Sequence, residues 1–97
     1  DLKNQGIVLE WIDRLARQEG LTVVLTTHHP HHAHAVADQA LLMMGTETCA
    51  CGPVAEILTE DNLQRLYDLP LCRVCFEYQG RTMETLTPVF TGLKGAR

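Results

Sequence analysis

The feature that most constrains the fold is a short apolar segment, residues 21–27, which follows Gly20. It is rich in branched residues and carries Val23, Val24 and Leu25 in succession, without alternating polar positions. Runs of this kind are typical of strands buried on both faces, in sheets that helices cover from each side. The segment therefore predicts an α/β fold, and Gly20 is expected to end a helix that precedes the strand.

Helical spacing is visible on both sides of this strand. Before it, Asp1 is the expected N-cap, because its carboxylate can accept free amide hydrogens of the first turn. The apolar positions of that helix recur every three or four residues: Val8, Leu9, Trp11, Ile12, Leu15 and Ala16. After the strand, Pro30 suits the first turn of a short helix ending near Ala37. A second apolar strand is predicted for residues 39–44, parallel to the first, because a helix-length crossover joins them.

The rest of the chain predicts shorter elements. Residues 49–52 are expected to form a return strand, and residues 53–58 one or two helical turns. Thr59 is the expected cap of a helix that carries Leu63, Leu66 and Tyr67. Residues 71–90 alternate around Gly80 and predict a β-hairpin. Two buried strands need more neighbours than 97 residues supply, so the α/β fold is expected to be incomplete without a missing N-terminal half.

Composition excludes several classes of protein. Hydrophobic residues make up 45% of the chain and charged residues 21%, which is typical of a folded domain rather than a disordered one. The net charge is −4 with scattered acidic residues, so nucleic acid is not an expected partner. No apolar run is long enough to span a bilayer, and no basic-then-apolar leader marks the chain for secretion.

His28 is the strongest candidate for chemistry, because it follows the first predicted strand directly. In open α/β sheets, ligands bind beyond the carboxyl ends of the strands. An imidazole there could hydrogen-bond a phosphate or a catalytic water, as donor or acceptor according to its tautomer. The alternative is a histidine that caps the following helix or lies in solvent.

The order of motifs resembles an ABC-transporter ATP-binding subunit of the iron-chelate and vitamin B12 importer type. In that family a buried strand ends in a switch histidine, and a short helix then leads to an Ala-Asp pair, another apolar strand and a turn glycine. The matching positions here are Thr22 to His28, Ala35, Ala37-Asp38, Leu41-Leu42 and Gly45. The tail and the opening also match: Gly52 to Leu58, Leu58-Thr59-Glu60-Asp61-Asn62-Leu63, Leu66-Tyr67, and Asp1-Leu2-Lys3-Asn4-Gln5.

This resemblance implies a role for two residues. His28 would contact the terminal phosphate of ATP and help to place the attacking water, as phosphoryl transfer requires. Asp1 would be the closing aspartate of the D-loop, at the interface of the nucleotide-sandwich dimer. Asp38 would be structural.

The resemblance also implies a division of the chain and a setting. Residues 1–70 would be the C-terminal portion of a P-loop NTPase-like ABC ATPase domain, and residues 71–97 a hairpin extension. The implied partners are a second copy of the ATPase subunit and transmembrane permease subunits. The subunit would be cytoplasmic, held peripherally at the inner face of the membrane through the permease without inserting itself. It would energise import of an iron chelate, haem, cobalamin or similar cargo.

The chain lacks the phosphate-binding loop, Gly-x-x-x-x-Gly-Lys-Ser/Thr, and the other motifs that precede the D-loop in the family. ATP and Mg²⁺ are therefore expected only in the full-length parent, and the isolated chain is expected not to hydrolyse ATP.

A non-enzymatic metal-binding module is the main alternative, and a decayed gene product without activity is a further one. Imidazoles and thiolates are the usual zinc ligands. The candidate ligands are His28, His29, His31, His32, His34, Cys49, Cys51, Cys72 and Cys75. Cys72 and Cys75 would point to opposite faces of a strand, so no set of four is forced together and no specific metal site is predicted. The cysteines are expected to be small buried hydrophobes, and residues 41–44 to be core.

Overall fold

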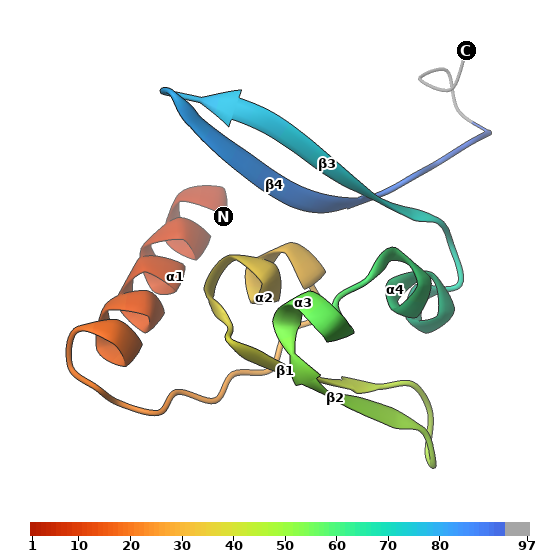
Figure 1. The fold of residues 1–97 in the computed structure, drawn as a ribbon, viewed down its shortest axis with the longest axis horizontal. Coiled ribbons are helices and arrows are strands. Elements are labelled where there is room, and N and C mark those ends of the chain that lie inside the picture. Colours follow the sequence, from red (N-terminus) through yellow and green to blue (C-terminus); the bar gives the residue numbers. More distant parts are fainter. Residues whose placement is uncertain (93–97) are drawn as a thin grey trace.

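The computed structural model describes residues 1–92 and has an α/β architecture (Figure 1). Its elements, in chain order, are α1 (Leu2–Arg17), α2 (Pro30–Val36), β1 (Gln39–Met43), β2 (Cys49–Pro53), α3 (Val54–Ile57), α4 (Glu60–Tyr67), β3 (Leu71–Tyr78) and β4 (Arg81–Pro88). The strands form two antiparallel pairs, β1 with β2 and β3 with β4. The end of the expected hairpin extension, residues 93–97, lies outside the described residues.

Both predicted helix caps are confirmed. The Asn4 amide donates to the Asp1 carboxylate at 2.9 Å, which satisfies one of the unpaired donors at the start of α1. The Asn62 amide donates to Thr59 Oγ1 at 3.1 Å at the start of α4. Gly20 has a φ of 67° and lies just beyond the end of α1, where its left-handed backbone turns the chain.

The predicted hairpin around Gly80 is also confirmed. β3 and β4 are in register from the Leu71–Pro88 pair to the Tyr78–Arg81 pair. Gln79 and Gly80 form the two-residue loop and have φ values of 50° and 76°. Positive φ at both loop positions is the type I′ geometry, whose twist matches that of the paired strands.

The core is small and joins the two hairpins through α3 and α4. Its buried side chains are all aliphatic: Leu42, Ile57, Leu58, Leu63, Leu71 and Leu86. β1 contributes Leu42, and the α3–α4 region contributes Ile57, Leu58 and Leu63. The C-terminal hairpin contributes Leu71 from β3 and Leu86 from β4. The hairpin β3–β4 therefore packs on the rest of the chain through its base, while its far end extends past α1 (Figure 1).

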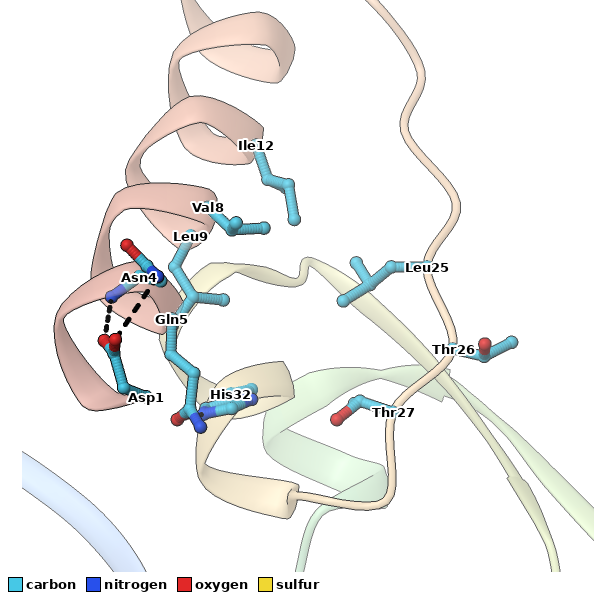
Figure 2. A pocket seen from close by; sticks show the side chains of 10 residues that line it. All are labelled: Asp1, Asn4, Gln5, Val8, Leu9, Ile12, Leu25, Thr26, Thr27 and His32. Carbon is cyan, nitrogen blue, oxygen red and sulfur yellow. Dashed lines mark hydrogen bonds between the residues drawn. The ribbon is translucent and has the colours of Figure 1, made fainter.

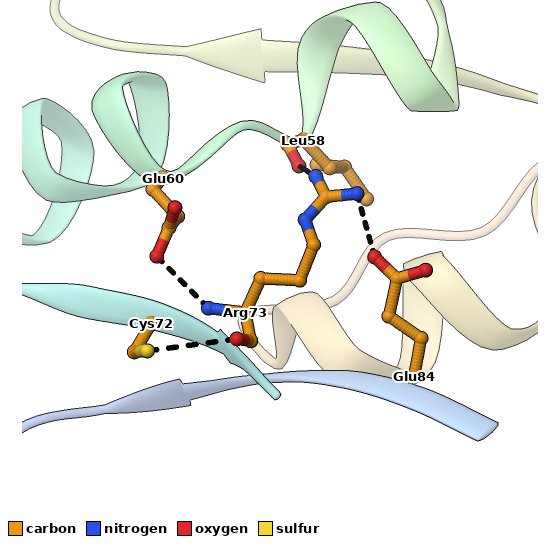
Figure 3. Close-up of polar contacts among 5 residues, drawn as sticks. All are labelled: Leu58, Glu60, Cys72, Arg73 and Glu84. Atoms are coloured by element: carbon orange, nitrogen blue, oxygen red, sulfur yellow. Dashed lines mark hydrogen bonds and ion pairs between the residues drawn. The ribbon is translucent and has the colours of Figure 1, made fainter. Parts of the chain in front are cut away.

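Arg73 of β3 adds a polar connection between this hairpin and the α3–α4 region (Figure 3). Its guanidinium pairs with Glu84 of β4 at 2.6 Å and donates to the Leu58 carbonyl at 3.3 Å. Its backbone amide, on the outer edge of β3, donates to the Glu60 carboxylate at 2.9 Å. One residue thus contacts β4, the α3–α4 junction and the start of α4.

The predicted strand at residues 21–27 is wrong. This segment is extended but belongs to no strand, and Figure 1 shows it as the long connection between α1 and α2. Val24 is 88% exposed, so the segment is not buried on both faces. The predicted parallel pairing with residues 39–44 is also wrong, because residues 21–27 form no strand and β1 pairs, within residues 1–92, with β2 alone, in antiparallel orientation. Within residues 1–92 no strand lies beside this segment to accept and donate its ladder hydrogen bonds.

Two burial predictions are also corrected. All four cysteines, Cys49, Cys51, Cys72 and Cys75, are free and exposed rather than buried. In β1, Leu42 is buried, whereas Leu41 and Met43 are 55% and 68% exposed. This alternation follows the two-residue period of a strand whose second face is uncovered in residues 1–92.

Candidate functional site

His28 lies in the turn between the extended segment and α2, one residue earlier than the N-cap His29. The peptide group that joins these two histidines is hydrogen-bonded at both ends. The His28 carbonyl accepts from Tyr67 Oη at 3.0 Å, and the His29 amide donates to Thr27 Oγ1 at 3.0 Å. The turn therefore has a defined backbone orientation, although the His28 side chain is exposed.

Four of the five histidines form a cluster of neighbouring rings, comprising His28, His29, His31 and His32. Their closest ring centroids are 4.3 Å apart, for His28 and His29, and 4.4 Å apart, for His31 and His32. Desolvation lowers the pKa of His29, and the nearby His28 and His32 rings lower it further. Desolvation also lowers the pKa of His31, with His32 and His29 adding to the effect. These two rings thus favour the neutral form.

A cavity of about 400 Å³ separates α1 from the extended segment (Figure 2). Its lining is Asp1, Asn4, Gln5, Val8, Leu9, Ile12, Leu25, Thr26, Thr27 and His32. Gln5 Oε1 and His32 Nε2 lie 3.2 Å apart across it and connect α1 to α2. Asp1 and residues 25–27, which lead into His28, therefore line the same cavity. The Asp1 carboxylate is engaged by Asn4, through its amide and through Nδ2 at 3.3 Å.

His28 itself lines a second cavity, of about 270 Å³, between the histidine turn and the base of the C-terminal hairpin. Tyr67 and Leu69 line it from α4 and the following loop, and Leu86 and Phe90 line it from the hairpin side. The lining is mainly apolar on the hairpin side and carries imidazoles on the other. The two residues predicted for the site, Asp1 and His28, thus line different cavities, and Thr27, which lines the cavity of Asp1, directly precedes His28.

The contact between Tyr67 and His28 is not predictable from the sequence. Tyr67 was expected only as an apolar position of its helix, 39 residues away from the histidine. No local spacing signals a hydrogen bond between a helix end and a distant turn. The Leu66-Tyr67 pair of the family pattern was the single hint that this position matters. Asp38, expected to be structural, accepts from Arg17 Nη2 at 3.5 Å, and its carbonyl accepts from the Val54 amide at 3.0 Å.

The described part of the chain contains no metal-binding site. Within residues 1–92, no three His, Cys, Asp or Glu side chains are grouped so that they could hold a metal ion. Residues 1–92 therefore offer no ligand set for Mg²⁺. Nor is any helix of residues 1–92 long and apolar enough to cross a membrane.

Comparison with known proteins identifies the family. No protein-family model matches the sequence. The chain is 38% identical over 93 residues to the molybdate import ATP-binding protein MolC of Haemophilus influenzae, which covers 96% of this chain and 35% of that protein. It is 31% identical over 77 residues to the vitamin B12 import ATP-binding protein BtuD of Vibrio cholerae, which covers 79% of this chain and 30% of that protein.

A solved structure agrees with these relatives. A chain described as belonging to a metal-chelate type ABC transporter, in an inward-facing conformation, superposes with a TM-score of 0.89 and 34% identity. That match covers 95% of this chain and 36% of the other. The chain thus spans about a third of the length of the relatives it matches. Sequence and structure agree that it belongs to the family of ABC-transporter ATP-binding subunits.

Proposed function

We propose that this chain is part of an ATP-binding subunit that couples ATP hydrolysis to the import of a metal-containing small molecule. The observation that carries the proposal is the agreement of sequence and fold with import ATPases over 95–96% of the chain. The relatives are named for molybdate and vitamin B12, and the structural neighbour is described as a metal-chelate type transporter. These three names have a metal atom in common, and the proposed cargo is accordingly an iron chelate, haem, cobalamin or a similar metal-containing molecule.

His28 is the residue that we assign to the reaction. Its position after the extended segment matches the switch histidine of the family, and its exposed imidazole is free to reach a ligand beyond the turn. A group that hydrogen-bonds a terminal phosphate and a water contributes by placing the nucleophile, which is most of what the protein does in phosphoryl transfer. Asp1 is assigned to the dimer interface, at the start of α1. Residues 71–97 are assigned to a hairpin extension of the ATPase portion, residues 1–70.

The chain by itself is proposed to be inactive. Its 97 residues contain no phosphate-binding loop, and backbone amides of such a loop are what hold the phosphates of a nucleotide. Activity therefore belongs to the whole subunit with ATP and Mg²⁺, a second copy of the subunit and the permease. The proposed setting is the inner face of the membrane, reached through the permease. A zinc module built from histidines and cysteines is not favoured, since residues 1–92 hold no grouped ligand set.

The test is a set of single substitutions in the whole subunit that carries these residues. We expect His28→Ala to leave ATP affinity nearly unchanged, because the phosphate-binding loop supplies most of it. Hydrolysis should fall by about a hundredfold or more, because a group that places the attacking water stabilises the transition state. Steady-state ATPase rates and nucleotide binding measure the two effects separately.

The matched controls are the four neighbouring histidines. His29→Ala, His31→Ala, His32→Ala and His34→Ala should each reduce hydrolysis far less than His28→Ala. Equal, small losses at all five positions would show that His28 has no special role. Folding that depends on zinc in the parent, and that several of these substitutions abolish, would instead support the metal-binding alternative.

A further inference from the structure

The His28–His29 peptide group is held from two directions by side chains. Tyr67 Oη donates to its carbonyl, and its amide donates to Thr27 Oγ1, each at 3.0 Å. A peptide group is planar, so two bonds at opposite ends fix the direction of that plane. They therefore restrict the ψ angle of His28 and the φ angle of His29.

The direction in which the His28 side chain leaves the backbone depends on this plane. In residues 1–92 no hydrogen bond is made to the His28 imidazole, and the ring's neighbour is the His29 ring, with centroids 4.3 Å apart. A side chain that is exposed and lacks its own polar partner keeps many rotamers. The backbone bonds are therefore the main restraint on where the imidazole can go.

Tyr67 is well suited to supply this restraint. It is the last residue of α4, which is anchored by the fully buried Leu63 and ended by Asp68 in the left-handed conformation. Burial raises the pKa of the Tyr67 phenol, so the hydroxyl keeps its proton and remains a donor. Its ring also lines the cavity beside His28. The hydroxyl group of Tyr67 thus connects the end of α4 to the histidine turn, although the two are distant in sequence.

From this geometry we infer that Tyr67 is a positioning residue for His28, acting through the backbone carbonyl of the histidine, with Thr27 as its counterpart on the amide side. The inference rests on the proposed function, because it requires His28 to act on the nucleotide. It adds Tyr67 to the residues on which ATP hydrolysis depends, and it makes the rate of hydrolysis depend on the position of the C-terminal end of α4. Tyr67 does not touch the substrate in this account.

Tyr67→Phe in the whole subunit tests the inference, because it removes the hydroxyl and keeps the ring that lines the cavity. We expect the ATPase rate to fall about three- to tenfold, the effect of one neutral hydrogen bond, with the KM for ATP unchanged. The matched control is Tyr78→Phe, since Tyr78 lies at the exposed end of the hairpin and should leave the rate unchanged. Thr27→Val should lower the rate similarly, and Thr27→Ser should restore it because the serine hydroxyl can accept the same bond.

A double variant separates positioning from a general structural effect. If Tyr67 acts through His28, then adding Tyr67→Phe to His28→Ala should lower the rate no further. Additive losses in the double variant would overturn the inference, as would a Tyr67→Phe enzyme with the parent rate. The failure of the proposed function is distinct: in that case His28→Ala itself would hydrolyse ATP as fast as the parent.

Discussion

Leu63 of α4 is fully buried in the small aliphatic core, together with side chains from β1, α3 and the C-terminal hairpin. Replacing leucine by alanine there removes three side-chain carbons, which loses apolar burial and leaves a cavity that the surrounding side chains fill only in part. We expect Leu63→Ala to lower the free energy of unfolding of the chain by about 2–5 kcal/mol. Urea unfolding followed by circular dichroism measures this loss.

The control for this substitution is Leu2→Ala, the same chemical change at a helix position that is 83% exposed. It should change the unfolding free energy by less than about 0.5 kcal/mol. Similar losses for the two variants would mean that Leu63 does not lie in a packed core.

Single residues were predictable from sequence where their structure depends on near neighbours. Asp1 and Thr59 each cap a helix by binding an amide three residues later, so the spacing itself indicates the bond. Whether Cys49 is buried or exposed, and the contact of Tyr67 with His28, depend on partners far along the chain. No local pattern contains that information, and the first was predicted wrongly while the second was missed.

At the scale of elements, the C-terminal hairpin depends on Arg73 for its polar attachment to the α3–α4 region. Arg73→Met keeps the aliphatic stem but removes the ion pair with Glu84 and the donor to the buried Leu58 carbonyl. The ion pair is more than a third exposed on the Arg73 side, 37%, so it contributes less than about 1 kcal/mol. With the unpaired carbonyl included, we expect a loss of about 1–2 kcal/mol.

Amide hydrogen exchange of β3 and β4 can locate this loss, because the hairpin should exchange faster while β1 and β2 keep their protection. Arg81→Met is the control, since Arg81 lies beside the turn at the other end of the same hairpin. A uniform increase over the whole chain, or the same effect from Arg81→Met, would contradict a local attachment by Arg73.

Elements were predictable when the pairing partner is adjacent in sequence. The hairpin around Gly80 and the return strand after Gly45 both form as predicted, because a short turn brings their strands together. Residues 21–27 have the apolar character of a buried strand. Among these described residues, however, only the Leu21 amide makes a backbone–backbone hydrogen bond, which it donates to the Leu15 carbonyl. Apolar character can be read from sequence, whereas the existence of a neighbouring strand cannot.

At the scale of the whole molecule, α1 is the least integrated part of residues 1–92. Its side chains include no buried residue, and Leu2, Val8 and Trp11 are more than half exposed. Its polar links to the rest are Gln5 to His32 and Arg17 to Asp38. The candidate site lies across this weakly joined boundary, since the cavity that contains Asp1 has α1 on one side and the segment before His28 on the other (Figure 2).

The histidine turn also lies where α1, α2 and the hairpin meet, so its protonation should affect the stability of the whole chain. The pKa values of His29 and His31 are lowered in the folded state, mainly by desolvation. The unfolded chain, with histidine pKa values near about 6.5, therefore binds protons first as the pH falls. Stability should be full above about pH 6.5 and decrease as the pH falls through the lowered folded values, because protonation then favours the unfolded state.

Urea unfolding of the chain at pH 7.5 and pH 5 tests this expectation against the variant His29→Gln/His31→Gln. Glutamine keeps a polar side chain but cannot gain a proton, so the variant should lose less stability than the parent between the two pH values. The two proteins differ only at these two positions, so the difference between their stability losses isolates the two imidazoles. Identical losses in parent and variant, or a parent that becomes more stable at pH 5 relative to the variant, would mean that these rings are not desolvated in the folded chain.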